Sequence, residues 1–282
     1  MTDVVLRAMT DDNSFRRIAA RTTETVRGVL ARQQCSGTTA RYFGDLLTAA
    51  VLIRETMAPL LRVQLILKGA TGCGSLIADS HPDGGTRGLV QVPVAARPFE
   101  LGPGALLHAM RTMYNRSIQQ GFVDVPASKG VSGALMSYLA QSEQIASIAC
   151  VSTVFRGDEL VVAGGYLMQL LPEADPAVLD ALLPNVESAG PIDTLLTQTM
   201  ADPSALLTLV TGGQSFTLLE QRPVAFACPC NEVRLLGSLA TLPREDIEEM
   251  IRDGATIEIG CDFCGTQYHI QPEQLRGLLQ TS

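Results

Sequence analysis

Four of the seven cysteines in this chain fall into two close pairs. One residue separates Cys228 from Cys230, two residues separate Cys261 from Cys264, and Gly265 allows a tight turn after the second pair. Thiolates are soft ligands that suit zinc, and each short turn brings two sulfurs to one ion at a small entropic cost. The sequence therefore predicts one zinc ion per chain, bound in the reduced state by Cys228, Cys230, Cys261 and Cys264.

Other readings of the cysteines are less consistent with the sequence. A thioredoxin-like Cys-x-x-Cys needs a βαβ setting, and Cys264 does not clearly open a helix. His269 could act as a ligand, but a fourth cysteine makes it unnecessary. The remaining cysteines stand alone, and we expect no catalytic role for them: Cys35, Cys73 and Cys150.

No catalytic constellation is evident elsewhere in the sequence. Ser142 and Glu143 have no histidine near them in sequence, and we interpret them as the end of a helix. A catalytic zinc ion keeps an open position beside typically three protein ligands, whereas four cysteines close the site. We therefore expect no enzyme activity and no catalytic residue.

Composition and charge restrict the class of protein. The chain has 282 residues, is 46% hydrophobic and carries a net charge of −8. Such a chain can bury a core, and its acidity disfavours nucleic acid and anionic membranes as partners. Its apolar stretches are too short to cross a bilayer, and its first residues lack a signal-peptide pattern. We expect a cytoplasmic protein whose cysteines are thiols or metal ligands.

Residues 1–172 predict an α+β core domain in which strands predominate. Alternating or aliphatic-rich runs bounded by turn residues indicate strands. These are Val4–Met9, Phe15–Arg21, Arg62–Lys68, Ser75–Asp79, Gly88–Val92, Gly121–Val125, Ile145–Val154 and Leu160–Leu170. Apolar residues at helical spacing predict helices over Thr38–Met57 and Gly133–Glu143.

Residues 173–221 differ in composition from the rest of the chain. They hold four Leu pairs and seven acidic residues but no Lys, Arg or His, so their net charge is −7. This composition predicts an acidic linker of short amphipathic helices, none of which would be stable alone. We expect these helices to be held by burial of their Leu faces and by Arg residues of the core domain, which carries a charge of +3.

Residues 222–282 predict a small zinc-binding domain. Pro243, two acids behind it and Gly254 mark the start and end of a helix. A strand over Thr256–Gly260 leads into Cys261, Tyr268–Ile270 could return as its hairpin partner, and Pro272–Leu279 predicts a last helix. The expected fold class is α+β, with a core domain, a helical linker and a four-cysteine zinc domain.

The spacing of the first cysteine pair points to a known family. Several segments accompany it in order: ARTTETVRG (20–28), QLILKG (64–69), RGLVQ (87–91), SEQIAS (142–147) and AGGYLMQLLP (163–172). With these and Tyr268, the chain resembles the redox-regulated holdase chaperones of the thirty-three-kilodalton heat-shock protein family over essentially its whole length. It departs from that family at Asn231–Val233, where an Arg-bearing stretch is expected, and at Phe226, where a Trp is expected.

The resemblance implies an ATP-independent chaperone that binds unfolded or aggregating client proteins during oxidative stress. It implies activation by oxidation of the zinc-bound cysteines with zinc release, forming the disulfides Cys228–Cys230 and Cys261–Cys264. A homodimer of the oxidised protein is among the implied partners. The alternative is a zinc-ribbon binding module whose metal is purely structural and undergoes no redox switching.

Overall fold

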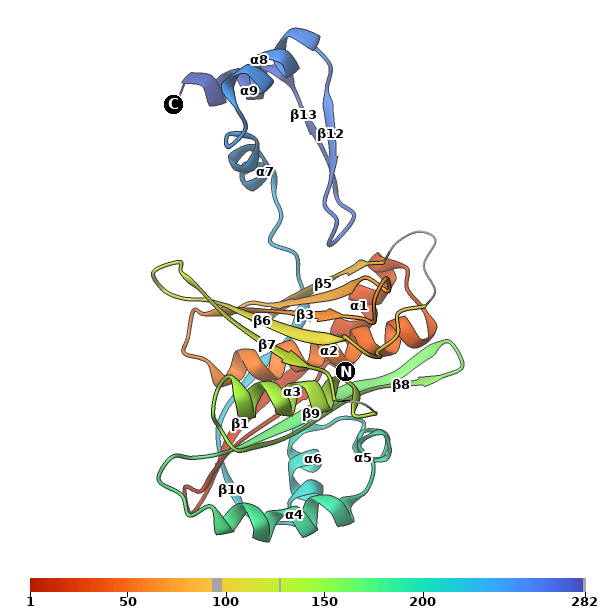
Figure 1. Ribbon diagram of the computed structural model, residues 1–282, viewed down its shortest axis with the longest axis vertical. Helices are drawn as coiled ribbons and strands as arrows, with labels where there is room; N and C mark the ends of the chain where they lie inside the picture. The colour runs from red at the N-terminus through yellow and green to blue at the C-terminus, as the bar shows by residue number, and fades with distance from the viewer. Residues whose placement is uncertain (93–97, 127, 281–282) are drawn as a thin grey trace. The chain divides into compact units, whose positions relative to one another are not determined.

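The computed structural model describes residues 1–92, 98–126 and 128–280 (Figure 1). These residues form two compact units, Met1–Ala227 and a second that begins at Cys228. No helix among the described residues is both long enough and apolar enough to cross a membrane.

The first unit contains a five-stranded and a six-stranded sheet. The five-stranded sheet is antiparallel throughout, in the order β10 (Phe216–Pro223), β1 (Val4–Thr10), β2 (Phe15–Arg21), β9 (Glu159–Leu170), β8 (Ser147–Arg156). The six-stranded sheet has the order β11 (Ala225–Phe226), β5 (Gly85–Gln91), β4 (Ser75–Ser80), β3 (Arg62–Lys68), β6 (Leu106–Thr112), β7 (Ile118–Asp124). In that sheet the β11–β5 pairing is parallel and the others are antiparallel.

Three helices lie between the two sheets and complete the main core (Figure 1). They are α1 (Thr23–Gln33), α2 (Gly37–Thr56) and α3 (Gly130–Gln141). Helix α2 contacts strands of both sheets, which explains why it is apolar around most of its circumference. Gly44 of α2 lies so close to Thr153 that a β-carbon added at Gly44 would lie 2.4 Å from the Thr153 hydroxyl oxygen. The predicted helix over Thr38–Met57 is thus the centre of the core.

Three further helices cover the other face of the five-stranded sheet: α4 (Ala177–Ala189), α5 (Ile192–Thr199) and α6 (Pro203–Val210) (Figure 1). The Leu pairs at 195–196 and 206–207 are fully buried against the sheet, whereas in the first pair Leu182 is buried and Leu183 is exposed. The fourth pair, Leu218 and Leu219, lies on the edge strand β10 and is 52% and 55% exposed. The amphipathic helices are therefore as predicted, but residues 216–221 extend the sheet.

The linker acids are held differently from our expectation. Among the seven, Glu220 forms ion pairs, with Arg7 and Arg222. On the helices, Asp193 accepts a hydrogen bond from the Ser152 hydroxyl at 2.5 Å, and Asp202 caps α6 by accepting one from the Ala205 N–H. Neutral hydroxyl and backbone donors therefore take the place of the expected Arg residues along the described helices of this segment.

The compact units divide the chain at a different point from the predicted segments. Residues 173–221 pack within the first unit, and that unit extends to Ala227 because β11 pairs with β5. Phe226 also packs closely against α1, because a β-carbon added at Gly28 would lie 3.0 Å from the β-carbon of Phe226. A two-residue strand carries too little sequence signal to be predicted, and its place depends on the neighbouring sheet edge.

The second unit contains a hairpin and three helices. Strands β12 (Ile257–Gly260) and β13 (Gln267–Ile270) pair antiparallel beside α7 (Glu232–Leu239), α8 (Arg244–Asp253) and α9 (Pro272–Gln280). Helix α8 starts after Pro243 and ends at Gly254, which is left-handed with φ +64°, as predicted. The buried apolar core of the unit consists of Ile247, Ile270 and Leu275 among the described residues.

Candidate metal centre

The two cysteine pairs are placed by different local structures. Cys228 and Cys230 lie in the irregular segment before α7, whose first turn is capped by the Asn231 side chain accepting from the Arg234 N–H. The second pair occupies the turn between β12 and β13. There the Gly265 N–H donates to the Cys261 carbonyl at 2.7 Å, and Gly265 takes a left-handed φ of +73°.

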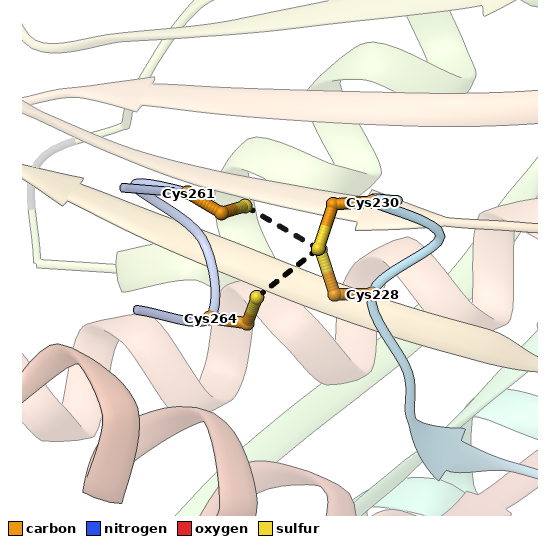
Figure 2. A group of neighbouring side chains, drawn as sticks. All are labelled: Cys228, Cys230, Cys261 and Cys264. Carbon is orange, nitrogen blue, oxygen red and sulfur yellow. Dashed lines mark hydrogen bonds between the residues drawn. The ribbon is translucent and has the colours of Figure 1, made fainter. Parts of the chain in front are cut away.

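The four sulfurs converge on one point (Figure 2). All lie within 4.8 Å of one another, with 3.8 Å between Cys228 and Cys261 and 3.3 Å between Cys230 and Cys264. A zinc ion about 2.3 Å from each of four tetrahedral sulfurs would hold those sulfurs about 3.8 Å apart. The four predicted cysteines therefore form a cluster that can hold a metal ion.

Hydrogen bonds to the sulfurs come from the hairpin of the second pair. The Tyr268 hydroxyl donates to Cys230 at 3.1 Å, and the Thr266 hydroxyl lies 3.2 Å from the Cys264 sulfur. The backbone N–H groups of Phe263 and Cys264 point at Cys261, and their hydrogen bonds favour its thiolate. Donors of this kind orient metal ligands and stabilise their charge.

Without a metal, the pKa values of Cys230, Cys261 and Cys264 shift in different directions. Burial raises the pKa of Cys230 and of Cys261, and contact with neighbouring sulfurs adds to this effect. Burial acts in the same direction on Cys264, but hydrogen bonds from Thr266 together with those from Cys230 and Cys261 outweigh it and lower the pKa of that thiol. Cys264 is thus the first of these three to ionise, and a cation would draw the others into the thiolate form.

Comparison with known proteins agrees with this arrangement. A family model described as "Hsp33 protein" matches residues 3–271. The chain belongs to the Hsp33 family. A "33 kDa chaperonin" of Geobacter sulfurreducens is 28% identical to it over 99% of this chain and 95% of that protein. One of Lacticaseibacillus casei is 30% identical over 99% of each.

A solved structure shares the Hsp33 fold over the whole chain. The crystal structure of the 33 kDa chaperonin from Thermotoga maritima matches with a TM-score of 0.80 at 22% identity, covering 100% of this chain and 99% of that one. The predicted family and the α+β fold class are therefore confirmed. Hsp33 proteins are chaperones, which is a class of protein distinct from enzymes.

The other residues considered in the sequence lie outside the Hsp33 cysteine cluster. The single cysteines 35, 73 and 150 are half-buried in the first unit, and burial raises the pKa of Cys35 and Cys150. Glu143 follows α3, accepts from the Tyr138 hydroxyl at 2.5 Å and pairs with Arg111 at 2.7 Å, which is a structural role. His269 is exposed on β13 and faces Glu258.

The two hydroxyl donors were not among the site residues predicted from the sequence. Tyr268 was noted only as a family landmark, and Thr266 was not considered. Their spacing carries a signal, because residues two and four positions after Cys264 follow the tight turn and can fold back toward the sulfurs.

Proposed function

We propose that this Hsp33 protein is an ATP-independent holdase that is switched on by oxidation of four zinc-bound cysteines. The observation that carries the proposal is the cluster of four sulfurs in a unit with very little core of its own. Membership of the Hsp33 family supports the chaperone function. The cysteine cluster is a site at which an oxidant could change the stability of the second unit.

The metal we propose is one zinc ion per chain. Four thiolates in a closed, tetrahedral arrangement suit zinc, whereas calcium and magnesium prefer oxygen ligands. Binding zinc contributes about 10–16 kcal/mol to the folding of small metal domains. Three buried apolar side chains cannot replace that contribution. The fold of residues 228–282 should therefore depend on the ion.

Oxidation removes the ligands by a balanced sequence of steps. One thiolate attacks a peroxide, so that an S–O bond forms, the O–O bond breaks and hydroxide leaves with the sulfur oxidised by two electrons. The neighbouring thiolate then attacks this sulfenic acid, forming an S–S bond as a second hydroxide leaves. We expect the pairs Cys228–Cys230 and Cys261–Cys264, and a disulfide sulfur no longer binds zinc as a thiolate.

The proposed consequence is exposure of apolar surface to clients. Once the second unit, which begins at Cys228, unfolds, residues 173–221 would no longer be followed by a folded domain. Their helices bury five of the six leucines in the first three pairs, so their release would expose both these side chains and the sheet beneath. Unfolded proteins with apolar, basic stretches are the expected clients of this acidic, Leu-rich surface. We also expect a cytoplasmic location and a homodimer in the oxidised state.

The test is to oxidise the reduced, zinc-loaded protein with peroxide at mild heat. Zinc release, client aggregation by light scattering and the sedimentation of the chaperone should be followed together. We expect zinc release and suppression of aggregation to rise in parallel. Equal activity of the reduced and oxidised proteins would reject the switch and leave a constitutive chaperone.

One observation favours the alternative of a purely structural zinc site. The sulfurs are at most half-exposed, and at least three of them accept hydrogen bonds, which protects thiolates from attack. Retention of zinc at peroxide concentrations that oxidise an unfolded control peptide of the same sequence would support that alternative.

A further inference from the structure

Each cysteine pair contains one sulfur that is hydrogen-bonded to a side-chain hydroxyl. In the first pair this is Cys230, bonded by Tyr268 at 3.1 Å, and in the second it is Cys264, beside Thr266 at 3.2 Å. A thiolate has no proton to give, so in the metal-bound state both hydroxyls must be the donors.

Positive side chains are missing from the sequence immediately around these sulfurs. Residues 228–233 and 260–268 contain no Lys, Arg or His, but they include Glu232 and Asp262. Four thiolates on a divalent cation leave a net charge of −2 on the centre. Within these segments only dipoles can meet the excess charge, and the two hydroxyls are side-chain dipoles in contact with sulfur.

The position of Tyr268 also connects the two pairs. It lies on β13, opposite Ile259 of β12, and so belongs to the hairpin that carries Cys261 and Cys264. Its hydroxyl nevertheless binds a sulfur of the first pair. This contact can hold the first pair against the hairpin independently of the metal.

We propose that Tyr268 and Thr266 are positioning residues that set how readily the centre is oxidised, each acting on the pair whose sulfur it contacts. The inference rests on the proposed zinc-thiolate centre. A donated hydrogen bond withdraws electron density from sulfur, which lowers its nucleophilicity toward peroxide and favours the charged, metal-bound form. Loss of the donor therefore makes the same sulfur both a poorer ligand and a better nucleophile.

The experiment uses the full-length protein with Tyr268→Phe and Thr266→Val, each loaded with zinc or cobalt. Tyr114→Phe is the matched control, because that hydroxyl binds the Pro59 carbonyl in the first unit. Thr266→Ser retains a hydroxyl and should behave like the parent protein. Zinc affinity should fall about 10-fold in Tyr268→Phe and Thr266→Val. The cobalt charge-transfer band should move to longer wavelength, because sulfur electrons are bound less tightly.

Site-resolved alkylation during peroxide treatment provides the decisive measurement. Tyr268→Phe should shorten the half-time of oxidation of Cys228 and Cys230 several-fold more than that of Cys261 and Cys264, and Thr266→Val should do the reverse. Unchanged cobalt spectra and parent-like half-times would overturn the inference. Equal acceleration of all four cysteines would also overturn it, because general loosening is not selective for a pair. These readouts need no client, so they are independent of whether the protein proves to be a redox-activated holdase.

Discussion

At the residue scale, a buried carboxylate shows how the first unit fixes a charge. Asp79 on β4 is fully buried and accepts hydrogen bonds from Arg62 at 2.8 Å, Arg87 at 2.9 Å and His81 at 3.2 Å. Burial acts to raise the pKa of Asp79, but these partners outweigh it and lower the pKa to about 2. Asp79 therefore stabilises the fold in its ionised form.

Asp79→Asn should destabilise the first unit by about 2–3 kcal/mol, because it leaves the guanidinium groups of Arg62 and Arg87 without their counter-charge. Both groups are partly exposed, which keeps the loss below that of a fully buried pair. Urea unfolding measures the change, with the exposed Asp158→Asn in the β8–β9 turn as control. The Asp79 contribution is present above the unfolded pKa of about 4 and is lost as pH falls toward the folded value. A loss of stability equal to that of Asp158→Asn would show that the network is not stabilising.

The cysteine ligands give a second prediction at this scale. Cys264→Ser should abolish stoichiometric zinc binding, because a serine hydroxyl is a poor ligand beside three thiolates. Metal analysis of the purified protein measures the zinc content. Cys73→Ser is the matched control, since Cys73 is half-buried in the first unit, and it should retain one zinc ion per chain. Full zinc occupancy in Cys264→Ser would contradict the four-cysteine assignment.

At the element scale, the linker helices differ in how firmly they are held. Helix α4 has Pro184 in its interior and buries only Leu182, whereas α5 and α6 each bury two adjacent leucines. An interior proline removes one helical hydrogen bond and disfavours the helix by about 3 kcal/mol relative to alanine. Helix α4 is thus the weakest part of the segment that we propose to be released.

Pro184→Ala should therefore slow amide exchange in α4 and make oxidative activation harder. Mass spectrometry of hydrogen exchange measures the first effect, and the peroxide dose at half-maximal activity measures the second. Slower exchange with an unchanged activation threshold would show that α4 does not limit the switch. Ala181→Gly, on the exposed side of the same helix, should have the opposite effect on exchange.

A pair of acidic side chains beside helix α5 should respond to pH. Asp193 on α5 and Asp45 on α2 line one cavity of about 790 Å³, together with Asp124 and Lys129. Burial, with a further contribution from Asp193, raises the pKa of Asp45 to about 7, and Thr153 and Arg41 offset only part of this. The Asp45 carboxyl is therefore neutral in mildly acidic solution.

A raised carboxyl pKa stabilises the folded state below the unfolded value, and the stabilisation is lost as pH rises through about 7. Exchange protection of α5, corrected for the intrinsic pH dependence of exchange, should consequently fall from about pH 4 to about pH 7 and level off above pH 7. Asp45→Asn should remove this dependence, and Asp180→Asn on α4 should leave it intact. The same pH dependence in Asp45→Asn would assign it to another group.

At the scale of the whole molecule, two units of very different core size share one chain. The first has two large apolar clusters, and the second has three buried apolar residues among those described and a cluster of four cysteines. Their stabilities should respond differently to chelation. The proposed switch requires that the response extends from residues 228–282 into residues 173–221.

Removal of zinc by a chelator under reducing conditions should expose amides throughout residues 228–282 to rapid exchange, because the remaining core cannot hold that unit. Strands β3 and β4 should keep their protection. Residues 173–221 should exchange faster than before, although they lie outside the metal unit. Unchanged protection over 173–221 would exclude them from the switch and confine the effect of zinc to its own domain.

Features that depend on local spacing can be predicted from the amino-acid sequence alone. Two short cysteine turns specify the candidate metal site, because the residues within each pair are held together by the chain itself. The apolar pattern over Thr38–Met57 specifies a helix, and alternation over Arg62–Lys68 specifies a strand whose Val63, Leu65 and Leu67 are buried. Proline, acidic residues and glycine fix both ends of α8.

Contacts between distant segments became apparent in the folded structure. The polar α1 and the strand β6 are stabilised by their neighbours in space, so their own sequences predicted neither. Residues 216–221 became an edge strand because β1 offered an unpaired row of backbone groups. Tyr268 reaches Cys230 through the pairing of β12 with β13. Each of these contacts joins residues far apart in sequence, and their free energy comes from packing and pairing that no local pattern records.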